Sequence, residues 1–239
     1  MLGVIVNSVA VVIGTLLGLV LKKGISKKIS DAVMVGVGLC VTFIAVGGLI
    51  VNENAEAVSL AAIVSIVLGA IIGSAVDIDK GLNTLGDKVA AKMQSKSGEK
   101  STVAEGFVNA TLLFCVGAMA IMGSISAGLE GDNTTLYIKS ILDFTSSVMF
   151  ASTLGIGVIF SIIPLTLYQG GIALCAGFLA PLLSQSATDA ITCTGSIILV
   201  GLSLNLIGIA KIKVANYLPA IFLSPFLYYF FEYILGLVK

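Results

Sequence analysis

The chain alternates between long apolar stretches and short segments that carry charge. A bilayer core about 30 Å thick is crossed by about 20 apolar residues in a helix that rises about 1.5 Å per residue. Stretches of this length recur along the whole sequence, and the pattern predicts eight membrane-spanning helices. They are Leu2–Leu21, Ala32–Val51, Val58–Val76, Gly106–Leu129, Ile138–Ile162, Ile163–Leu183, Ala190–Ala210 and Val214–Leu237.

Two of these assignments depend on their flanking residues. The first stretch resembles a signal peptide, but no basic segment precedes it and four lysines follow it, so we interpret it as a membrane helix. Residues 144–188 carry no charge, and this run is too long for one span. Gly155, Gly157 and Pro164 lie where the chain would break and fold back.

The segment 77–100 differs from the rest. Ile78, Leu82 and Leu85 recur at helical spacing among charged residues. This predicts an amphipathic helix on the cytoplasmic membrane surface, with Asp79 as its N-cap. We expect residues 1–239 to form a single polytopic membrane domain that includes this surface helix.

The composition supports lipid as the main solvent. Hydrophobic residues make up 57% of the chain and charged residues 11%, whereas a soluble domain has roughly a quarter charged residues. All 13 basic residues are lysines, and the chain contains no Arg, His or Trp. Without His there is no catalytic triad and no histidine zinc site. Nucleic-acid binding is not expected either, because the lysines lie between apolar spans.

Known catalytic and cofactor motifs are also missing from the sequence. There is no Walker motif, no dinucleotide-binding fingerprint and no metal-ligand cluster. The cysteines, Cys40, Cys115, Cys175 and Cys193, lie inside apolar segments without CxxC spacing, which is typical of small hydrophobic side chains. We therefore expect neither an enzyme nor a bound cofactor.

The lysines predict the orientation. Cytoplasmic loops of membrane proteins are enriched in basic residues. The first, third and seventh loops hold 11 of the 13 lysines, and the loops between them are acidic or neutral. With eight spans, this alternation places both termini outside a bacterial plasma membrane.

Two parts of the chain resemble each other. Gly14–Leu21 is similar to Gly177–Leu183, and the segment Ser26–Asp31 is similar to Ser184–Asp189. Spans one to three would then repeat as spans six to eight in the opposite orientation, with a gap in the linker. Inverted repeats are typical of secondary transporters and of some channels. The alternative is chance similarity.

Asp143 is the first candidate site residue, because a charged group within a span is costly. Ser147 lies on the same helix face, and Lys139 precedes Asp143 by one turn. The functional interpretation is a cation or proton site lined by hydroxyls. The alternative is a Lys139–Asp143 pair that satisfies itself near the outer interface.

Other polar residues interrupt the spans. Gln169-Gly170-Gly171 suggests a broken helix that faces a polar substrate. Asn109 lies in the fourth span, where glycines at 117 and 123 would allow local unwinding. Asn7 and Asn205 are further candidates. Helix packing and interhelical hydrogen bonds explain each of them as an alternative.

Several motifs together resemble one family. They are Cys115-Val-Gly117, Met122-Gly-Ser-Ile125, Gly128-Leu-Glu-Gly-Asp132, Lys139-Ser-Ile-Leu-Asp143, Phe150–Val158, Tyr168-Gln-Gly170 and the residues around Asn7 and Gly14. This set is similar to the YdfK/YqgA-like bacterial membrane proteins, the domain of unknown function 554. The resemblance implies a multi-spanning plasma-membrane protein, sometimes described as a transporter. Ala118 and Phe144 depart from the family pattern, which often has Pro and Gly there.

Three functions remain in contention. The first is a secondary transporter or permease for a small solute or ion, in which Asp143 couples a cation or proton and Gln169, Asn109 and Asn7 bind the substrate. The second is an ion channel with the same polar lining. The third is a membrane scaffold or sensor without transport. The partners are the lipid bilayer and the solute or ion, and a homo-oligomer is left open.

Overall fold

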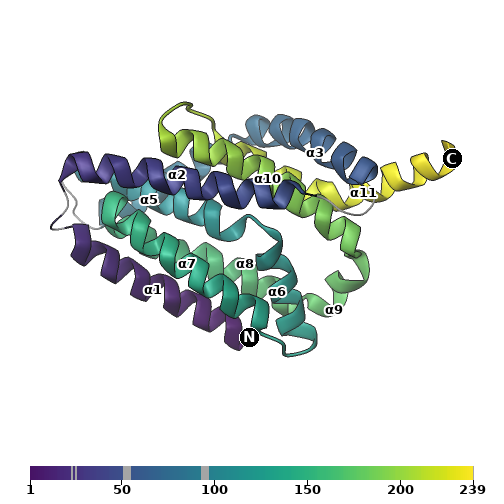
Figure 1. The fold of residues 1–239 in the computed structure, drawn as a ribbon, viewed down its shortest axis with the longest axis horizontal. Coiled ribbons are helices and arrows are strands. Elements are labelled where there is room, and N and C mark those ends of the chain that lie inside the picture. Colours follow the sequence, from purple (N-terminus) through teal and green to yellow (C-terminus); the bar gives the residue numbers. More distant parts are fainter. Residues whose placement is uncertain (23, 25, 51–54, 93–96, 239) are drawn as a thin grey trace.

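Long apolar segments form helices here because a helix satisfies its backbone hydrogen bonds without water. The computed structural model describes residues 1–22, 24, 26–50, 55–92 and 97–238, and this part contains helices and no strand (Figure 1). The elements in chain order are α1 (Leu2–Lys22), α2 (Lys27–Leu49), α3 (Ala55–Val76), α4 (Ile78–Lys92), α5 (Ser97–Cys115), α6 (Ala118–Leu129), α7 (Thr134–Leu154), η1 (Gly155–Ser161), α8 (Ile162–Leu174), α9 (Ala176–Leu179), η2 (Ala180–Leu182), α10 (Gln185–Ile207), η3 (Val214–Tyr217) and α11 (Pro219–Val238). The all-α fold class is thereby confirmed.

Six described helical segments are long and apolar enough to cross a bilayer. The count rises to seven if α5 and α6, which bend by 60° relative to each other, are taken together as one broken span. The uncharged segment Thr134–Leu174 counts once among the six, although it contains α7, η1 and α8. The count of eight spans therefore stays a prediction.

This segment folds back at η1. Along α7, Leu136 lies beside Gly3 of α1 and Ala151 lies beside Gly18, so α1 and α7 run parallel. In α8 the Thr166 hydroxyl hydrogen-bonds the Ser8 hydroxyl at 2.7 Å, which places the start of α8 back near the start of α1. The reversal follows Gly155, whose φ of 85° is in the region that favours glycine.

Glycines bring α1 and α7 into close contact. A Cβ on Gly14 would lie 2.6 Å from the Phe144 carbonyl oxygen, and one on Gly18 would lie 2.5 Å from the Val148 carbonyl oxygen. No larger side chain fits without moving the helices apart. Gly14 and Gly18, a small-xxx-small pair, thus form this interface.

Helices α2 and α10 are antiparallel neighbours of equal length. Gly38 lies against Ile207, and Gly48 lies against Thr192 and Ser196. Each helix has 23 residues. Each also begins after a serine N-cap, where Ser26 accepts a hydrogen bond from the Ile29 N–H and Ser184 accepts one from the Ala187 N–H.

Helices α3 and α11 form a second antiparallel pair. Gly69 lies against Ala220 and Gly73 against Asn216, so the end of α3 meets the start of α11. The Asn216 side chain also accepts a hydrogen bond from the Asp79 N–H at 2.8 Å. The contacts fix the short connection between α3 and α4.

The amphipathic segment is shorter than predicted. Helix α4 covers Ile78–Lys92, residues 93–96 lie outside the described part of the chain, and residues 97–100 begin α5. Asp79 lies in the first turn of α4 and is not its N-cap, because Asp77, with a φ of 52°, immediately precedes the helix. The Lys213 ammonium lies 3.2 Å from the Asp77 carboxylate, and this hydrogen bond lowers the pKa of Asp77.

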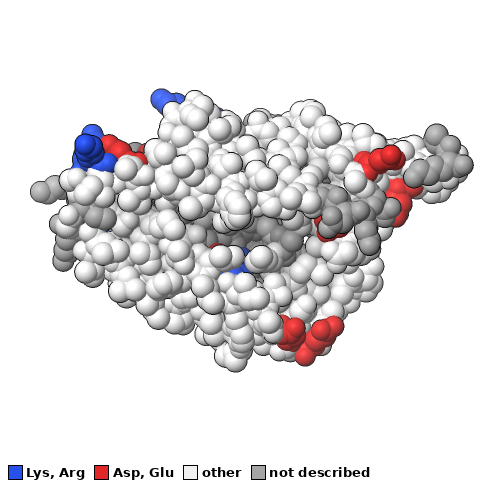
Figure 2. Space-filling model, in the orientation of Figure 1, with Lys and Arg blue, Asp and Glu red and all other residues white. Residues whose placement is uncertain are grey.

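Charges gather toward the two ends of the bundle, and on the face seen in Figure 2 the belt between them is uncharged except inside one hollow. The ends of α1 and α10 and the start of α2 bring Lys22, Lys27 and Lys28 to the same end as Lys211 and Lys213. Within the described residues, the opposite end carries carboxylates, namely Glu56, Glu130, Asp132 and Asp189. Lys23, Lys96 and Lys239 lie outside the described residues. This belt is the surface expected to face lipid.

We predict that Gly14→Ala destabilises the protein by about 1–3 kcal/mol, the usual range for overpacking a close contact. The added methyl group collides with the α7 backbone. Gly36→Ala is the matched control in another helix, because a Cβ there meets nothing within 4 Å. Thermal unfolding in detergent measures both Tm values. An unchanged Tm for Gly14→Ala would show that the α1–α7 contact is looser than described.

Candidate functional site

A buried ion pair lies inside the bundle. Lys139 and Asp143 occupy successive turns of α7, and the Lys139 ammonium hydrogen-bonds the Asp143 Oδ2 atom. Lys139 is 6% exposed and Asp143 is 5% exposed. At about 1.5 Å per residue, they lie about 7 and 13 Å from the start of α7. The pair is therefore enclosed within the bundle, between about one and three helical turns from the start of α7.

Two amides from other helices complete the polar cluster. Asn7 of α1 donates from Nδ2 to Asp143 Oδ2 at 2.9 Å and to Gln169 Oε1 of α8 at 3.3 Å. Both amides are fully buried. Three segments that are far apart in sequence thus meet at the Asn7 amide, which joins Asp143 of α7 to Gln169 of α8.

The cluster has spare hydrogen-bonding capacity. Asn7 Oδ1 and Gln169 Nε2 are buried without a hydrogen-bond partner among the described residues. Buried polar atoms are almost always paired in native proteins, because leaving one unpaired costs about 1–3 kcal/mol. The cluster can therefore accept one further donor and one further acceptor.

The close approach of α1 to α7 positions these side chains. Gly14 and Gly18 lie on α7 without a side chain between the helices. Asn7 is seven residues before Gly14, which is two helical turns, so it lies on the same face. The sequence pattern that packs α1 therefore also directs Asn7 toward Asp143.

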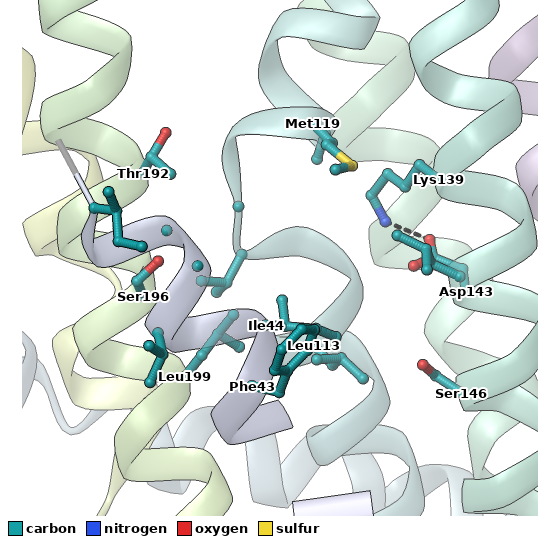
Figure 3. A pocket seen from close by; sticks show the side chains of 18 residues that line it. Phe43, Ile44, Leu113, Met119, Lys139, Asp143, Ser146, Thr192, Ser196 and Leu199 are labelled. Carbon is teal, nitrogen blue, oxygen red and sulfur yellow. Dashed lines mark hydrogen bonds and ion pairs between the residues drawn. The ribbon is translucent and has the colours of Figure 1, made fainter. Parts of the chain in front are cut away.

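A cavity of about 710 Å³ lies beside the ion pair. Its walls come from α2, from the α5–α6 junction, from α7 and from α10 (Figure 3). Most of its surface is apolar. The polar groups that line it are Lys139, Asp143, Ser146, Thr192 and Ser196.

The α5–α6 break opens onto this cavity. Helix α5 ends at Cys115 and α6 starts at Ala118, with Gly117 at a φ of 134°. Val116, Gly117 and Met119 line the cavity wall. Local unwinding was predicted at glycine 117, and its place beside a cavity fits the rule for irregular backbone at membrane depth.

The ammonium of Lys139 faces an aromatic ring as well as the carboxylate. Its Nζ atom lies 5.9 Å from the centre of the Phe114 ring. A cation over a ring face is stabilised by the ring quadrupole. Together with Asp143, this contact offsets part of the desolvation of the buried charge.

Two predicted residues lie at the cluster without contributing a polar group to it. The Ser147 hydroxyl donates to the Asp143 carbonyl oxygen at 2.6 Å, which is a hydrogen bond within α7. Gly170 is buried next to Gln169, and α8 continues through it without a break. The break predicted at Gln169-Gly170-Gly171 is wrong in position, since α8 ends at Leu174 and Cys175 follows.

Two other predicted residues lie apart from the cluster. Asn205 has a structural role, because its amide exchanges two hydrogen bonds, of 2.7 and 2.8 Å, with the backbone of Ile212. Asn109 is half-buried on α5 and makes no hydrogen bond to the described residues of the cluster. Neither residue was distinguishable from a site residue by its polarity alone.

The α10 side of the cavity was not predicted from the sequence. Thr192 and Ser196 are one turn apart and both point toward the cavity in Figure 3. The Thr192 hydroxyl donates to the Thr188 carbonyl oxygen, and Ser196 makes no hydrogen bond within the described residues. Their spacing of four residues in an apolar span was the signal available in the sequence.

The apolar belt, the charged ends and the buried polar cluster define a polytopic α-helical membrane protein. A family described as "Protein of unknown function (DUF554)" matches residues 2–229. The chain belongs to this family, which confirms the YdfK/YqgA-like resemblance.

Two curated relatives are similar over nearly their whole length. The "Uncharacterized membrane protein YdfK" of Bacillus subtilis (strain 168) is 30% identical over 225 residues, which is 94% of each chain. The "Uncharacterized protein YqgA" of Escherichia coli (strain K12) is 31% identical over 229 residues, covering 93% of this chain and 94% of that protein. No solved structure matches the chain.

We predict that Asp143→Asn destabilises the protein by about 3–5 kcal/mol, the range for removing one partner of a buried pair. Lys139 would then be a buried charge without a counter-ion. The double variant K139M/D143N removes both charges and should recover most of the lost stability. Circular dichroism of thermal unfolding in detergent compares the three proteins. If Asp143→Asn were as stable as the parent protein, water would have to reach the Lys139 ammonium freely.

Proposed function

We propose that the protein is a secondary transporter or permease that moves a small solute or ion across the bacterial plasma membrane. The observation that carries this proposal is the cluster of Asn7, Lys139, Asp143 and Gln169, which lies within the apolar belt beside a cavity. Polar groups at this depth are costly and mark functional positions in membrane proteins.

The unpaired amide atoms support substrate binding in particular. A purely structural network would use Asn7 Oδ1 and Gln169 Nε2, yet neither has a partner in the described residues. A solute that offers a donor and an acceptor would satisfy both. In this proposal Asp143 carries the charge-coupled step, because its Oδ2 atom joins α7 to α1.

The helix pairing supports the predicted inverted repeat. An offset of 158 residues superimposes the bounds of α2 on those of α10, including the serine N-caps. In a two-fold arrangement with this offset, Gly48 corresponds to residue 206 and Ser196 corresponds to Gly38. The Gly48–Ser196 contact then predicts a contact between residues 206 and 38, and Gly38 lies beside Ile207, the next residue. Such contacts fit a pseudo-two-fold axis that lies in the membrane plane and relates the two repeats. In transporters with inverted repeats, the two related halves serve as gates on opposite sides of the membrane.

The orientation is part of the proposal. The Lys-rich end of the bundle faces the cytoplasm, and both termini face outward. A fusion of alkaline phosphatase to the C-terminus in Escherichia coli should be active, and a green fluorescent protein fusion there should be dark. A fusion at the α10–η3 loop, between Lys211 and Lys213, should show the opposite pattern. The reverse result at both sites would invert the orientation.

The transport proposal is tested with proteoliposomes and labelled solutes. A panel of amino acids, short carboxylates and amines provides the probes, and at least one should enter faster than in protein-free vesicles with saturable kinetics. Asp143→Asn should lower that rate by about tenfold or more, since a hydrogen bond to a charged group contributes about 1.5–3 kcal/mol.

Two controls make this result specific. K139M/D143N should transport no faster than Asp143→Asn although it is more stable. A low transport rate in both variants would therefore be due to the missing charge and not to poor folding. Asn205→Ala alters a residue outside the cluster and should leave the rate per folded protein unchanged. Undiminished transport in folded Asp143→Asn, or no uptake of any probe, would contradict the proposal. Unitary currents would identify a channel.

A further inference from the structure

The cavity opens on a long side of the molecule, beside α2 and α6. Its rim is formed by apolar side chains that are exposed on the outside of the helices. Phe43 is 81% exposed, Ile50 is 70% exposed and Met119 is 46% exposed. In Figure 2 the hollow lies on the long side of the molecule, and charged side chains show inside it between largely uncharged surroundings.

The cavity floor has the opposite chemistry. Lys139 and Asp143 lie there, and Thr192 and Ser196 line the α10 side of the same cavity (Figure 3). An apolar entrance above a charged floor disfavours the entry of a small hydrophilic solute by this side opening, because the solute would have to cross hydrocarbon. It fits a molecule that already resides in the bilayer and carries a polar group.

The charges of the floor specify the polar group further. In the described residues, Lys139 Nζ uses one of its three donors, on Asp143 Oδ2, and Asp143 Oδ1 makes no hydrogen bond. The floor therefore offers spare N–H donors and a spare carboxylate oxygen side by side, with no net charge. The complementary ligand has an anionic oxygen for Lys139 and an ammonium for Asp143.

We propose that the cavity binds the headgroup of a zwitterionic lipid, which enters from the side through the rim of Phe43, Ile50 and Met119. The inference rests on the site of the proposed function and narrows its solute to an amphiphile with adjacent ammonium and phosphate groups. The volume of about 710 Å³ lies in the usual range of ligand pockets, about 300–1,000 Å³. A headgroup fits inside, and the acyl chains remain along α2 and α6 at the rim.

An anionic lipid without an ammonium group fits less well. Its phosphate would pair with Lys139 but would also meet the Asp143 carboxylate without a cation between them. Like charges held close together in a site of low dielectric repel strongly. The floor should therefore select for the zwitterion.

The absence of Trp from the chain permits a direct binding test. Phe43→Trp places a single fluorophore at the cavity rim. Phe226→Trp is the control on α11, where the side chain is 68% exposed and does not line the cavity. Each variant is reconstituted in vesicles of equal parts phosphatidylethanolamine and phosphatidylglycerol, with brominated acyl chains on one lipid or on the other. The membrane composition stays constant, and only the quencher changes.

We expect bromines on phosphatidylethanolamine to quench the Phe43→Trp variant more strongly, with a relative binding constant of about ten, because a charge-assisted hydrogen bond contributes about 1.5–3 kcal/mol. The Phe226→Trp variant should be quenched equally by both labels. K139M/D143N in the Phe43→Trp background should abolish the preference. Ile50→Trp is a second rim reporter that should give the same result if Phe43→Trp perturbs the fold.

Three outcomes would overturn the inference. Equal quenching of the Phe43→Trp variant by both labels, or stronger quenching by phosphatidylglycerol, would show no selection for the zwitterion. Little quenching by either label would mean that a second copy of the chain covers the rim. A preference that persists in K139M/D143N would assign it to another site. Because quenching measures binding without flux, solute uptake without lipid preference would leave the proposed function standing and remove this inference.

Discussion

The ion pair between Lys139 and Asp143 is the interaction on which the rest of the site depends. Transferring either charge alone into the bundle would cost several kcal/mol, and only a partner at hydrogen-bond distance offsets this. Asn7 and the Phe114 ring add contacts to the same two groups. The pair therefore fixes how α1, α7 and α8 meet, and it leaves charge beside a cavity where an apolar core would have been more stable.

Helix packing gives the pair its surroundings. The glycines of α1 let that helix lie directly on the α7 backbone, which brings the Asn7 amide to the carboxylate. On the other side, α7 lies away from α10, and the break at Gly117 widens the space between them into the cavity. The same chain thus closes one face of the carboxylate with an amide and leaves the other face open.

Much of the fold could be predicted from the sequence, because hydropathy reports directly on lipid-facing helices. The cost of polar groups in lipid singled out Asn7, Asp143 and Gln169 one by one, but their meeting and the α1–α7 contact at Gly14 and Gly18 depend on the tertiary packing. The role of Asn205 could not be predicted, because its partner is the backbone of a loop. The position of the α8 break was wrong, since two glycines in a row are tolerated within a helix that its neighbours support. Thr192 and Ser196 were missed because a hydroxyl in an apolar span gives a weak signal, since it often bonds its own helix, as that of Thr192 does.

The open face of the ion pair is, in this view, a binding surface for a polar group within the membrane. A density map of the protein in nanodiscs that contain phosphatidylethanolamine would test this most directly. We expect density not due to protein in the cavity, in contact with Lys139 Nζ and Asp143 Oδ1. A cavity closed by repacked side chains, with the ion pair sealed among Asn7, Gln169 and the α10 hydroxyls, would contradict it.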